Sequence, residues 1–284
     1  MSYRTRFAPS PTGLLHLGHA FSALTALDRA RAKGGDFLLR IEDIDRARCK
    51  PAFEAAIFED LNWLGLSWPR PVLRQSARQA AYDAALARLA SLGLCFPCRC
   101  SRGDIRAALG APQEGAPING PDDPVYPGTC RNRQMAEAGP DDAIRLDMAA
   151  ALAHLGSASG LSFTETGPLR TGTHGLDAGE LPRGVGDIVL ARRDIGTSYH
   201  IAVVVDDAHQ KITEVVRGDD LFTATQIHVL LQALLELPTP SYYHHRLIRD
   251  ESGKRLAKRD DARAIARYRD EGRSPGDIRR MVGL

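Results

Sequence analysis

The sequence has little of what marks membrane, secreted or repeat proteins. None of its apolar runs approaches the roughly 20 residues that span a bilayer. Its first residues are polar and form no apolar signal core, so we expect a cytoplasmic protein with no membrane partner. It contains no internal repeat or low-complexity tract, which argues against a repeat architecture. With 284 residues, 43% hydrophobic and 25% charged, it suits one large domain or a core domain with an insertion.

Cysteine and net charge are also low. The five cysteines are an odd number and four of them fall within 95–130, which in a cytoplasmic chain argues against a disulfide framework. The net charge is only +2, but residues 244–284 hold 12 Lys/Arg and 7 Asp/Glu. Such a basic tail indicates a polyanionic partner, with a solvated helical face as the alternative.

The first part of the chain alternates strand and helix patterns. The expected strands are 5–8 and 37–41, and the expected helices are about 18–33, 51–64 and 76–92. Pro51 suits a first helical position, and Ser76 with Gln79 forms a capping-box pattern. This alternation predicts an α/β sheet that is at least partly parallel.

The later part is less regular. Residues 95–130 are rich in Cys, Pro and Gly, with an irregular loop expected at 111–128, and 156–184 show no clear pattern. The apolar run 200–205 predicts a strand buried on both faces. Other expected elements are strands at 142–148, 187–193 and 212–216, a helix at 223–237, and one or two short helices in the last forty residues. We therefore expect an α/β core in two halves (1–94 and 141–240), an insertion (95–140) and a short helical end (241–284).

The motif at 9–19 carries the strongest functional signal. Prolines and a glycine within 9–13 force a tight turn, and His16, Gly18 and His19 follow where a helix is expected to begin. A helix N-terminus offers unpaired N–H groups and partial positive charge, and the small Gly18 admits a flat polyanion. This pattern indicates a nucleoside triphosphate site. Two ordinary surface or core histidines are the alternative.

Four further side chains suit an acidic amino acid as substrate. Arginine pairs with carboxylates in bidentate fashion, and a carboxylate pairs with an ammonium group. Arg6, Glu42 and Arg217 fall at expected strand ends, where α/β proteins place ligand contacts, and Tyr199 precedes the expected strand 200–205. Each alone is more often a surface ion pair or a core tyrosine.

A second anchor is the basic stretch 254–259, which follows Asp250-Glu251-Ser252-Gly253. A lysine-rich loop flanked by glycine can close over the charge that develops on a triphosphate during phosphoryl transfer. A solvated basic loop is the alternative reading of this stretch.

Taken together, these motifs resemble class I aminoacyl-tRNA synthetases of the glutamyl type. The stretch 9–19 resembles their "HIGH" signature and 255–259 their "KMSKS" loop, while 40–45, 202–207 and 216–220 are also similar, in the same order. The resemblance implies a Rossmann-like catalytic core that activates glutamate with ATP and Mg²⁺ and passes the glutamyl group to RNA. On matching positions it implies that glutamate is held by Arg6, Phe7, Ala8, Pro9, Ser10, Glu42, Tyr199 and Arg217. It likewise implies that ATP is served by His16, Gly18, His19 and Lys258, of which His16, His19 and Lys258 would be catalytic.

The loop departs from its signature at two positions. Arg255 stands in place of the first lysine and keeps the charge, whereas Ala257 stands in place of the usual serine and removes a hydroxyl donor. The resemblance therefore leaves the rate of activation open. A non-catalytic protein that binds an adenylate-like ligand or tRNA is an alternative.

The length of the chain favours a shortened form of this family. A glutamyl-tRNA synthetase continues for roughly two hundred residues beyond this loop, whereas about 25 remain here. The chain thus resembles the glutamyl-queuosine tRNA(Asp) synthetases, in which glutamate goes onto the queuosine base of the anticodon stem-loop. That resemblance implies tRNA(Asp) as partner, and we expect a monomer. A catalytic fragment of a glutamyl-tRNA synthetase is the alternative.

The cysteine cluster supports the same family. Cys98, Cys100, Tyr126 and Cys130 resemble its zinc pattern, and thiolates with a fourth donor suit a structural, tetrahedral Zn²⁺. Such an ion would stabilise an inserted subdomain too small to have a core of its own. Cys95 is a rival fourth ligand because Cys95-x-x-Cys98 is an ordinary zinc spacing, and thiols without metal are a further alternative.

Overall fold

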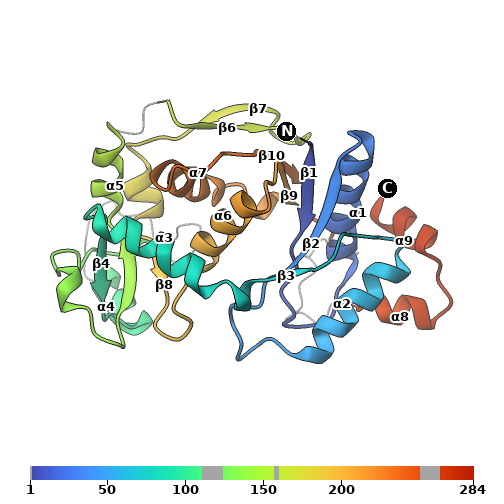
Figure 1. Ribbon diagram of the computed structural model, residues 1–284, viewed down its shortest axis with the longest axis horizontal. Coiled ribbons are helices and arrows are strands. Elements are labelled where there is room, and N and C mark those ends of the chain that lie inside the picture. The colour runs from blue at the N-terminus through green and yellow to red at the C-terminus, as the bar shows by residue number, and fades with distance from the viewer. Residues whose placement is uncertain (1, 111–123, 157–159, 250–262) are drawn as a thin grey trace.

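The structure is a computed structural model that describes residues 2–110, 124–156, 160–249 and 263–284 (Figure 1). Its strands are β1 (Arg4–Phe7), β2 (Asp36–Ile41), β3 (Leu73–Arg74), β4 (Cys95–Cys98), β5 (Ala143–Leu146), β6 (Ser162–Glu165), β7 (Gly172–Gly175), β8 (Val189–Ala191), β9 (Glu214–Gly218) and β10 (Ser241–His245). Its α-helices are α1 (Leu17–Ala32), α2 (Pro51–Trp63), α3 (Gln79–Ser91), α4 (Arg102–Gly110), α5 (Met148–His154), α6 (Tyr199–His209), α7 (Thr225–Leu234), α8 (Ile265–Asp270) and α9 (Pro275–Val282).

Two largely parallel sheets meet along one edge. The first has the order β1-β2-β3 and is wholly parallel, and the second has the order β7-β6-β10-β9 with only β6 and β7 antiparallel. Strand β9 lies beside β1, where the Thr213 N–H donates to the Arg4 carbonyl at 3.0 Å (Figure 1). The chain order therefore switches between β1 and β9, which is the position where doubly wound sheets bind ligands.

Helices cover both sides of this sheet system. Helix α1 buries Leu24, Ala23 and Leu27 against the first sheet, in a core that also includes residues of α8 and α9. The C-terminal helix α9 lies beside α1 (Figure 1), where Arg279 pairs with Asp28 at 2.8 Å. A second core, between α3, α5, α6 and α7, supports the other half.

A third sheet, with the order β4-β5-β8, is antiparallel and lies at the opposite end of the molecule from α9 (Figure 1). Strands β5 and β8 lie outside the range 95–140 expected for the insertion, yet they complete the sheet that β4 begins. None of the helices in the described residues is long and apolar enough to cross a membrane.

The strand predicted at 200–205 is wrong, because this segment belongs to helix α6. All of His200–Val204 is buried, so the helix is apolar on nearly every side, and a short apolar run does not distinguish a buried strand from a buried helix. Two adjacent buried carboxylates, Asp206 and Asp207, lie near the C-terminal end of this helix. Asp206 accepts hydrogen bonds from Gln75, Arg78 and Tyr82, whereas Asp207 faces the arginines of β1 and β2.

The capping box predicted at Ser76 and Gln79 is also wrong. Helix α3 begins at Gln79 after a short 3-10 turn, with Arg78 as its N-cap. The Ser76 hydroxyl instead donates to Asp43 at 2.6 Å, a tertiary contact that the local pattern does not reveal. The other expected strands and helices of the core are confirmed to within a few residues, and the unassigned segment 156–184 contains β6 and β7.

Candidate active site

A cavity of about 570 Å³ opens where the strands of both sheets end. Its lining comes from the turn after β1, the start of α1, and the ends of β2, β9 and β10. Nine residues predicted from the sequence line it: Arg6, Phe7, Ala8, His16, Gly18, His19, Glu42, Tyr199 and Arg217. The structure therefore brings together side chains that are up to about two hundred positions apart in the chain, at the edge where parallel sheets bind ligands.

The two histidines of the opening motif cap helix α1. His16 Nδ1 accepts the Gly18 N–H at 3.1 Å, and His19 Nδ1 accepts the His16 N–H at 3.2 Å. A ring nitrogen that accepts a hydrogen bond carries no proton, so both neutral rings hold their proton on Nε2. The helix start therefore offers imidazole donors together with its own backbone dipole, which suits phosphate oxygens.

Arg6 is tied into a buried ion network. Its Nε and Nη2 donate to the two carboxylate oxygens of Asp207 at 2.9 and 3.3 Å. Arg40, which is fully buried, donates to the same Asp207 at 2.7 Å and to Glu42 at 3.1 Å. The edge of the Arg6 guanidinium formed by Nε and Nη2 is therefore already occupied by Asp207. Arg6 contributes charge and its remaining N–H groups to the cavity.

The network also controls the protonation of its carboxyl groups. Burial raises the pKa of Glu42, and the charges of Arg40 and Arg6 oppose that rise only in part. Burial also acts on Asp207, but there the two arginines prevail and its pKa is lowered. Asp207 is therefore the fixed anion of the pair, whereas Glu42 lies at the cavity wall, where an ammonium group would favour its charged form.

Tyr199 lies at the first position of α6 and lines the same cavity. Burial raises the pKa of its phenol, so the hydroxyl keeps its proton and remains able to donate. Tyr199 thus lies beside the other predicted residues, although it begins a helix and does not precede a strand.

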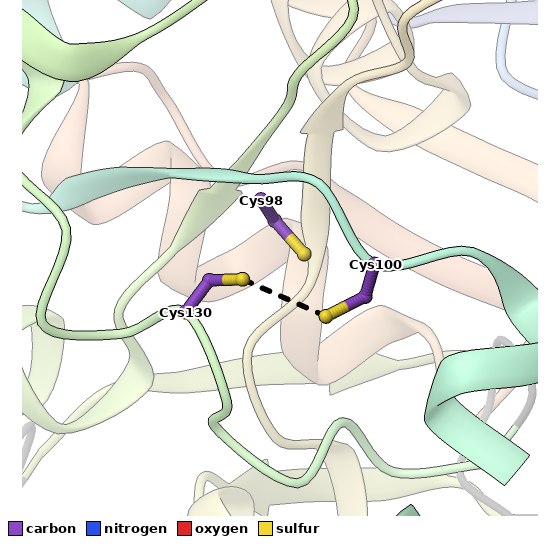
Figure 2. A group of neighbouring side chains, drawn as sticks. All are labelled: Cys98, Cys100 and Cys130. Carbon is purple, nitrogen blue, oxygen red and sulfur yellow. Dashed lines mark hydrogen bonds between the residues drawn. The ribbon is translucent and has the colours of Figure 1, made fainter. Parts of the chain in front are cut away.

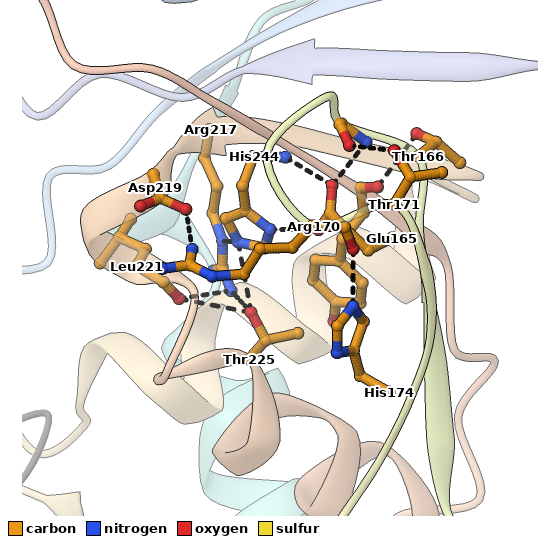
Figure 3. A network of polar contacts seen from close by, with 12 residues as sticks. Glu165, Thr166, Arg170, Thr171, His174, Arg217, Asp219, Leu221, Thr225 and His244 are labelled. Atoms are coloured by element: carbon orange, nitrogen blue, oxygen red, sulfur yellow. Dashed lines mark hydrogen bonds and ion pairs between the residues drawn. The ribbon is translucent and has the colours of Figure 1, made fainter.

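Arg217 lies near the end of β9 and makes four contacts inside the protein, of which Figure 3 labels the partners His244, Thr225 and Leu221. Its Nε donates to His244 at 3.1 Å, its Nη1 contacts His228 at 3.0 Å, and its Nη2 donates to Thr225 at 2.7 Å and to the Leu221 carbonyl at 3.2 Å. A guanidinium has five N–H donors, and these contacts use four of them. Arg217 therefore meets the cavity with its charge and one N–H, which leaves it one donor rather than two for a substrate carboxylate.

Two predicted residues, Pro9 and Ser10, do not line this cavity. The Pro9 carbonyl accepts the Glu42 N–H at 3.0 Å, so Pro9 positions Glu42 from behind the cavity wall. Ser10 lines a smaller cavity of about 150 Å³, which Glu42 and Tyr199 also border. Lys258 and the rest of the stretch 254–259 lie outside the described residues.

Sequence reasoning missed the residues that hold these side chains in place. Asp207 and Arg40 both fall within stretches that carry the resemblance, but nothing in those stretches indicates that both are buried ions. His228 and His244 gave no signal, because each is a single histidine within an ordinary helix or strand pattern. A charged residue inside an otherwise apolar strand, such as Arg40, is the one signal that could have been used.

A second cavity, of about 770 Å³, extends from Tyr199 toward the antiparallel sheet. Its lining is rich in arginine, and the five that contribute are Arg102, Arg106, Arg145, Arg192 and Arg193. Arg102 and Arg106 are exposed and lie four positions apart on α4, on the same side of the helix. Tyr199 is in the lining of both cavities, so they adjoin at this residue.

Three thiols converge at the side of this second cavity (Figure 2). The sulfur atoms of Cys98, Cys100 and Cys130 all lie within 4.8 Å of one another. The Tyr126 hydroxyl lies 3.4 Å from Cys98 Sγ and 3.6 Å from Cys100 Sγ. Among the described residues, this is the group of His, Cys, Asp or Glu side chains that could hold a metal ion.

The spacing fits a zinc ion. Two thiolates at about 2.3 Å from one tetrahedral zinc lie about 3.8 Å apart. The observed separation of Cys100 Sγ and Cys130 Sγ is 3.5 Å. Burial raises the pKa of Cys130, but hydrogen bonds from Tyr126 and the Arg99 backbone more than offset this and bring it to about 7. Cys95 instead packs in the apolar core with α3, α5 and α6, and burial raises the pKa of its thiol to about 12.

The family described as "tRNA synthetases class I (E and Q), catalytic domain" matches residues 2–141 and 179–284. A protein of Rhodobacter capsulatus named Glutamyl-Q tRNA(Asp) synthetase is 59% identical over 283 residues, which are 99% of each chain. A protein of Nocardia farcinica with the same name is 41% identical over 96% of this chain and 81% of its own.

Solved structures show the same fold. The glutamate-tRNA synthetase of Elizabethkingia anophelis superposes with a TM-score of 0.76 at 25% identity, and a glutamate tRNA ligase of Elizabethkingia meningosepticum, in complex with its amino acid, with 0.75 at 26%. Each comparison covers the whole of this chain but only 61% of the other. The chain thus spans less than two thirds of these two enzymes. A methionyl-tRNA synthetase of Mycobacterium tuberculosis, at 12% identity and a TM-score of 0.59, shares the fold alone.

Proposed function

The chain belongs to the class I tRNA synthetases of the glutamyl and glutaminyl type, and it is a ligase. From this premise we propose that it activates glutamate with ATP and transfers the glutamyl group to the queuosine base in the anticodon loop of tRNA(Asp). The single observation that carries the proposal is the first cavity, whose lining combines the two histidines of the opening motif, two arginines and the Glu42 carboxylate.

In this proposal the first step joins glutamate to AMP. The α-carboxylate oxygen of glutamate attacks the α-phosphorus of ATP, an O–P bond forms, and the bond to the β-phosphate oxygen breaks to release pyrophosphate. His16 and His19 donate from Nε2 to phosphate oxygens, with Lys258 as a further cation. Glu42 faces the substrate ammonium, and Arg6 and Arg217 supply the positive field for its carboxylates. Mg²⁺ would neutralise phosphate charge when bound with ATP.

The protein contributes positioning and charge to this step. No covalent intermediate with a side chain is needed, because both reactants are held in one cavity and the leaving group is already activated. The phenol of Tyr199 and the N–H that Arg217 retains would orient the amino acid. Because the Asp207 network fixes Arg6, little reorganisation is needed when the substrate binds.

The arginine-rich second cavity is our candidate for the acceptor base. It adjoins the first cavity at Tyr199, so an unstacked base placed there would lie next to an adenylate. Exposed arginines on α4 suit the phosphates of an RNA loop, whereas a closed pocket suits base recognition. The Cys98, Cys100 and Cys130 thiolates with Tyr126 would hold a structural Zn²⁺ at the wall of this cavity, and the ion would fix the loop at 126–130 to β4.

Pyrophosphate exchange and charging assays test the proposal. We expect ATP–pyrophosphate exchange that requires glutamate but not tRNA, followed by transfer of labelled glutamate to tRNA(Asp) that contains queuosine. The matched control is tRNA(Asp) in which the unmodified guanosine replaces queuosine. Equal charging of both tRNAs, or charging at the 3′ end, would favour a glutamyl-tRNA synthetase fragment. Binding of both small substrates without exchange would favour a non-catalytic module.

A further inference from the structure

Arg217 is held from one side by a buried glutamate–histidine pair. Glu165 ends β6, in the segment between the two ranges that the family matches, and its Oε2 lies 2.5 Å from His244 Nδ1 (Figure 3). Its Oε1 accepts the backbone N–H groups of Gly167 at 2.6 Å and of His244 at 2.9 Å. Both side chains of the pair are 1% exposed. The other ring nitrogen, His244 Nε2, receives the Nε–H of Arg217.

From the other side Arg217 is held by two imidazoles. His228 Nδ1 lies 3.0 Å from Arg217 Nη1, and His228 Nε2 lies 3.1 Å from His200 Nδ1. Both rings are buried, and His200 also lines the second cavity. A line of polar contacts therefore runs from Glu165 through Arg217 to His200, and it joins the walls of the two cavities.

The direction of every hydrogen bond in this line follows from Arg217. A guanidinium only donates, so His244 Nε2 and His228 Nδ1 must both accept. His244 then carries its proton on Nδ1 and donates it to Glu165. His228 carries its proton on Nε2 and donates it to His200. The two rings that hold one arginine are thus neutral and of opposite tautomer.

We propose that Glu165, His244 and His228 are positioning residues that fix the guanidinium of Arg217, so that its one remaining N–H points at the amino-acid carboxylate. The inference rests on the proposed function for the identity of that carboxylate. Its structural part does not, because the contacts of Arg217 with the two rings fix their tautomers without any substrate. Each residue acts through Arg217 and none lines the first cavity.

Nitrogen-15 NMR of the imidazoles tests the tautomers in the wild-type protein, without any substrate. Protonated and unprotonated ring nitrogens have well separated shifts, so each ring reports its own state. We expect His244 protonated at Nδ1 and His228 protonated at Nε2. Either ring in the opposite tautomer, or both charged at neutral pH, would overturn the proposal.

Substitutions of two buried glutamates, Glu165 on β6 and Glu214 on β9, separate positioning from general stability. In Glu165→Gln the amide oxygen still accepts the two backbone N–H groups, so its NH₂ meets the Nδ1–H of His244. The ring must then move its proton to Nε2, against Arg217. We expect KM for glutamate to rise about tenfold or more, while KM for ATP changes less than about twofold. Glu214→Gln is the control, because Glu214 is an equally buried carboxylate on β9 that binds Arg29.

The control variant Glu214→Gln must be less stable than wild type without a selective rise of KM for glutamate over KM for ATP. An equal rise in KM for glutamate in both variants would show a merely structural role and refute the positioning claim. In His228→Asn the side chain keeps an acceptor at the δ position, so KM for glutamate should stay within about threefold of wild type. His228→Leu has no acceptor there, so its KM for glutamate should rise by more than this. If wild-type protein shows no glutamate-dependent exchange, the proposed function fails, and the NMR result still decides the arrangement around Arg217.

Discussion

Replacing His16 by Asn separates two tasks that one imidazole performs. The ring caps helix α1 through Nδ1 and, in the proposed reaction, donates to phosphate through Nε2. Asn places an oxygen where Nδ1 lies and is itself a favoured N-cap, but it has no group at the Nε2 position. The variant His16→Asn should therefore keep the cap and lose the phosphate donor, whereas His16→Ala loses both.

The two losses differ in size and in assay. Loss of a side-chain cap costs about 1 kcal/mol, which in a chain of this length lowers Tm by roughly 2–4 °C. Loss of one donor to developing oxyanion charge costs about 3–4 kcal/mol, or a rate factor of roughly 10²–10³. We expect His16→Asn to unfold within about 1 °C of wild type while pyrophosphate exchange falls about a hundredfold. His16→Ala should show both defects.

Calorimetry and exchange kinetics on the same preparations give both numbers. Wild-type exchange by His16→Asn would refute the phosphate role. If Tm of His16→Asn is lowered as much as Tm of His16→Ala, the claim that the side chain caps α1 is refuted. His19→Asn is a matched companion, since His19 Nδ1 accepts the His16 N–H in the same way.

Three other predictions concern separate parts of the molecule. Lys258→Ala should lower exchange by orders of magnitude with KM for glutamate nearly unchanged, and wild-type exchange rates would contradict the ATP role. Metal analysis should find about one zinc per chain in wild type and in Cys95→Ala but far less in Cys100→Ser, and the reverse order would make Cys95 the ligand. Burial and the charge of Arg217 hold the pKa of His228 well below its usual range. The unfolded state thus binds more protons than the folded state below about pH 6.5. The free energy of unfolding should therefore decrease as the pH is lowered through this range, and it should decrease less steeply in His228→Asn. The same dependence on pH in both proteins, measured by urea titrations, would contradict this.

The sequence predicted the parts of the site that local chemistry marks. The turn at 9–13 follows from rules about short segments, as do the two histidines at the start of α1 and the polar residues at strand ends. These histidines and polar residues meet in one cavity. Local rules also found β1, β2, α1 and α2. The resemblance added the order of the motifs, which no single motif carries.

What could not be predicted depends on contacts between distant segments. The run 200–205 is equally apolar as helix or strand, and only the packing of α6 against α3 and α7 decides between them. The contacts of the two site arginines inside the protein could not be predicted for a related reason. Whether Arg6 faces a substrate or a carboxylate of the protein depends on Asp207, which is 201 positions away.

Helix α6 carries two neighbouring carboxylates that anchor it in different directions. Asp206 is bound by Gln75, Arg78 and Tyr82, and Asp207 by the arginines of the central strands, while the same helix starts with Tyr199. A helix fixed on two sides cannot turn about its axis to suit a different ligand. Redesign of the amino-acid preference therefore has to exchange side chains while the backbone of this helix stays in place. Directed evolution that depends on a tilt of the helix would first have to remove the contacts of one of the two carboxylates.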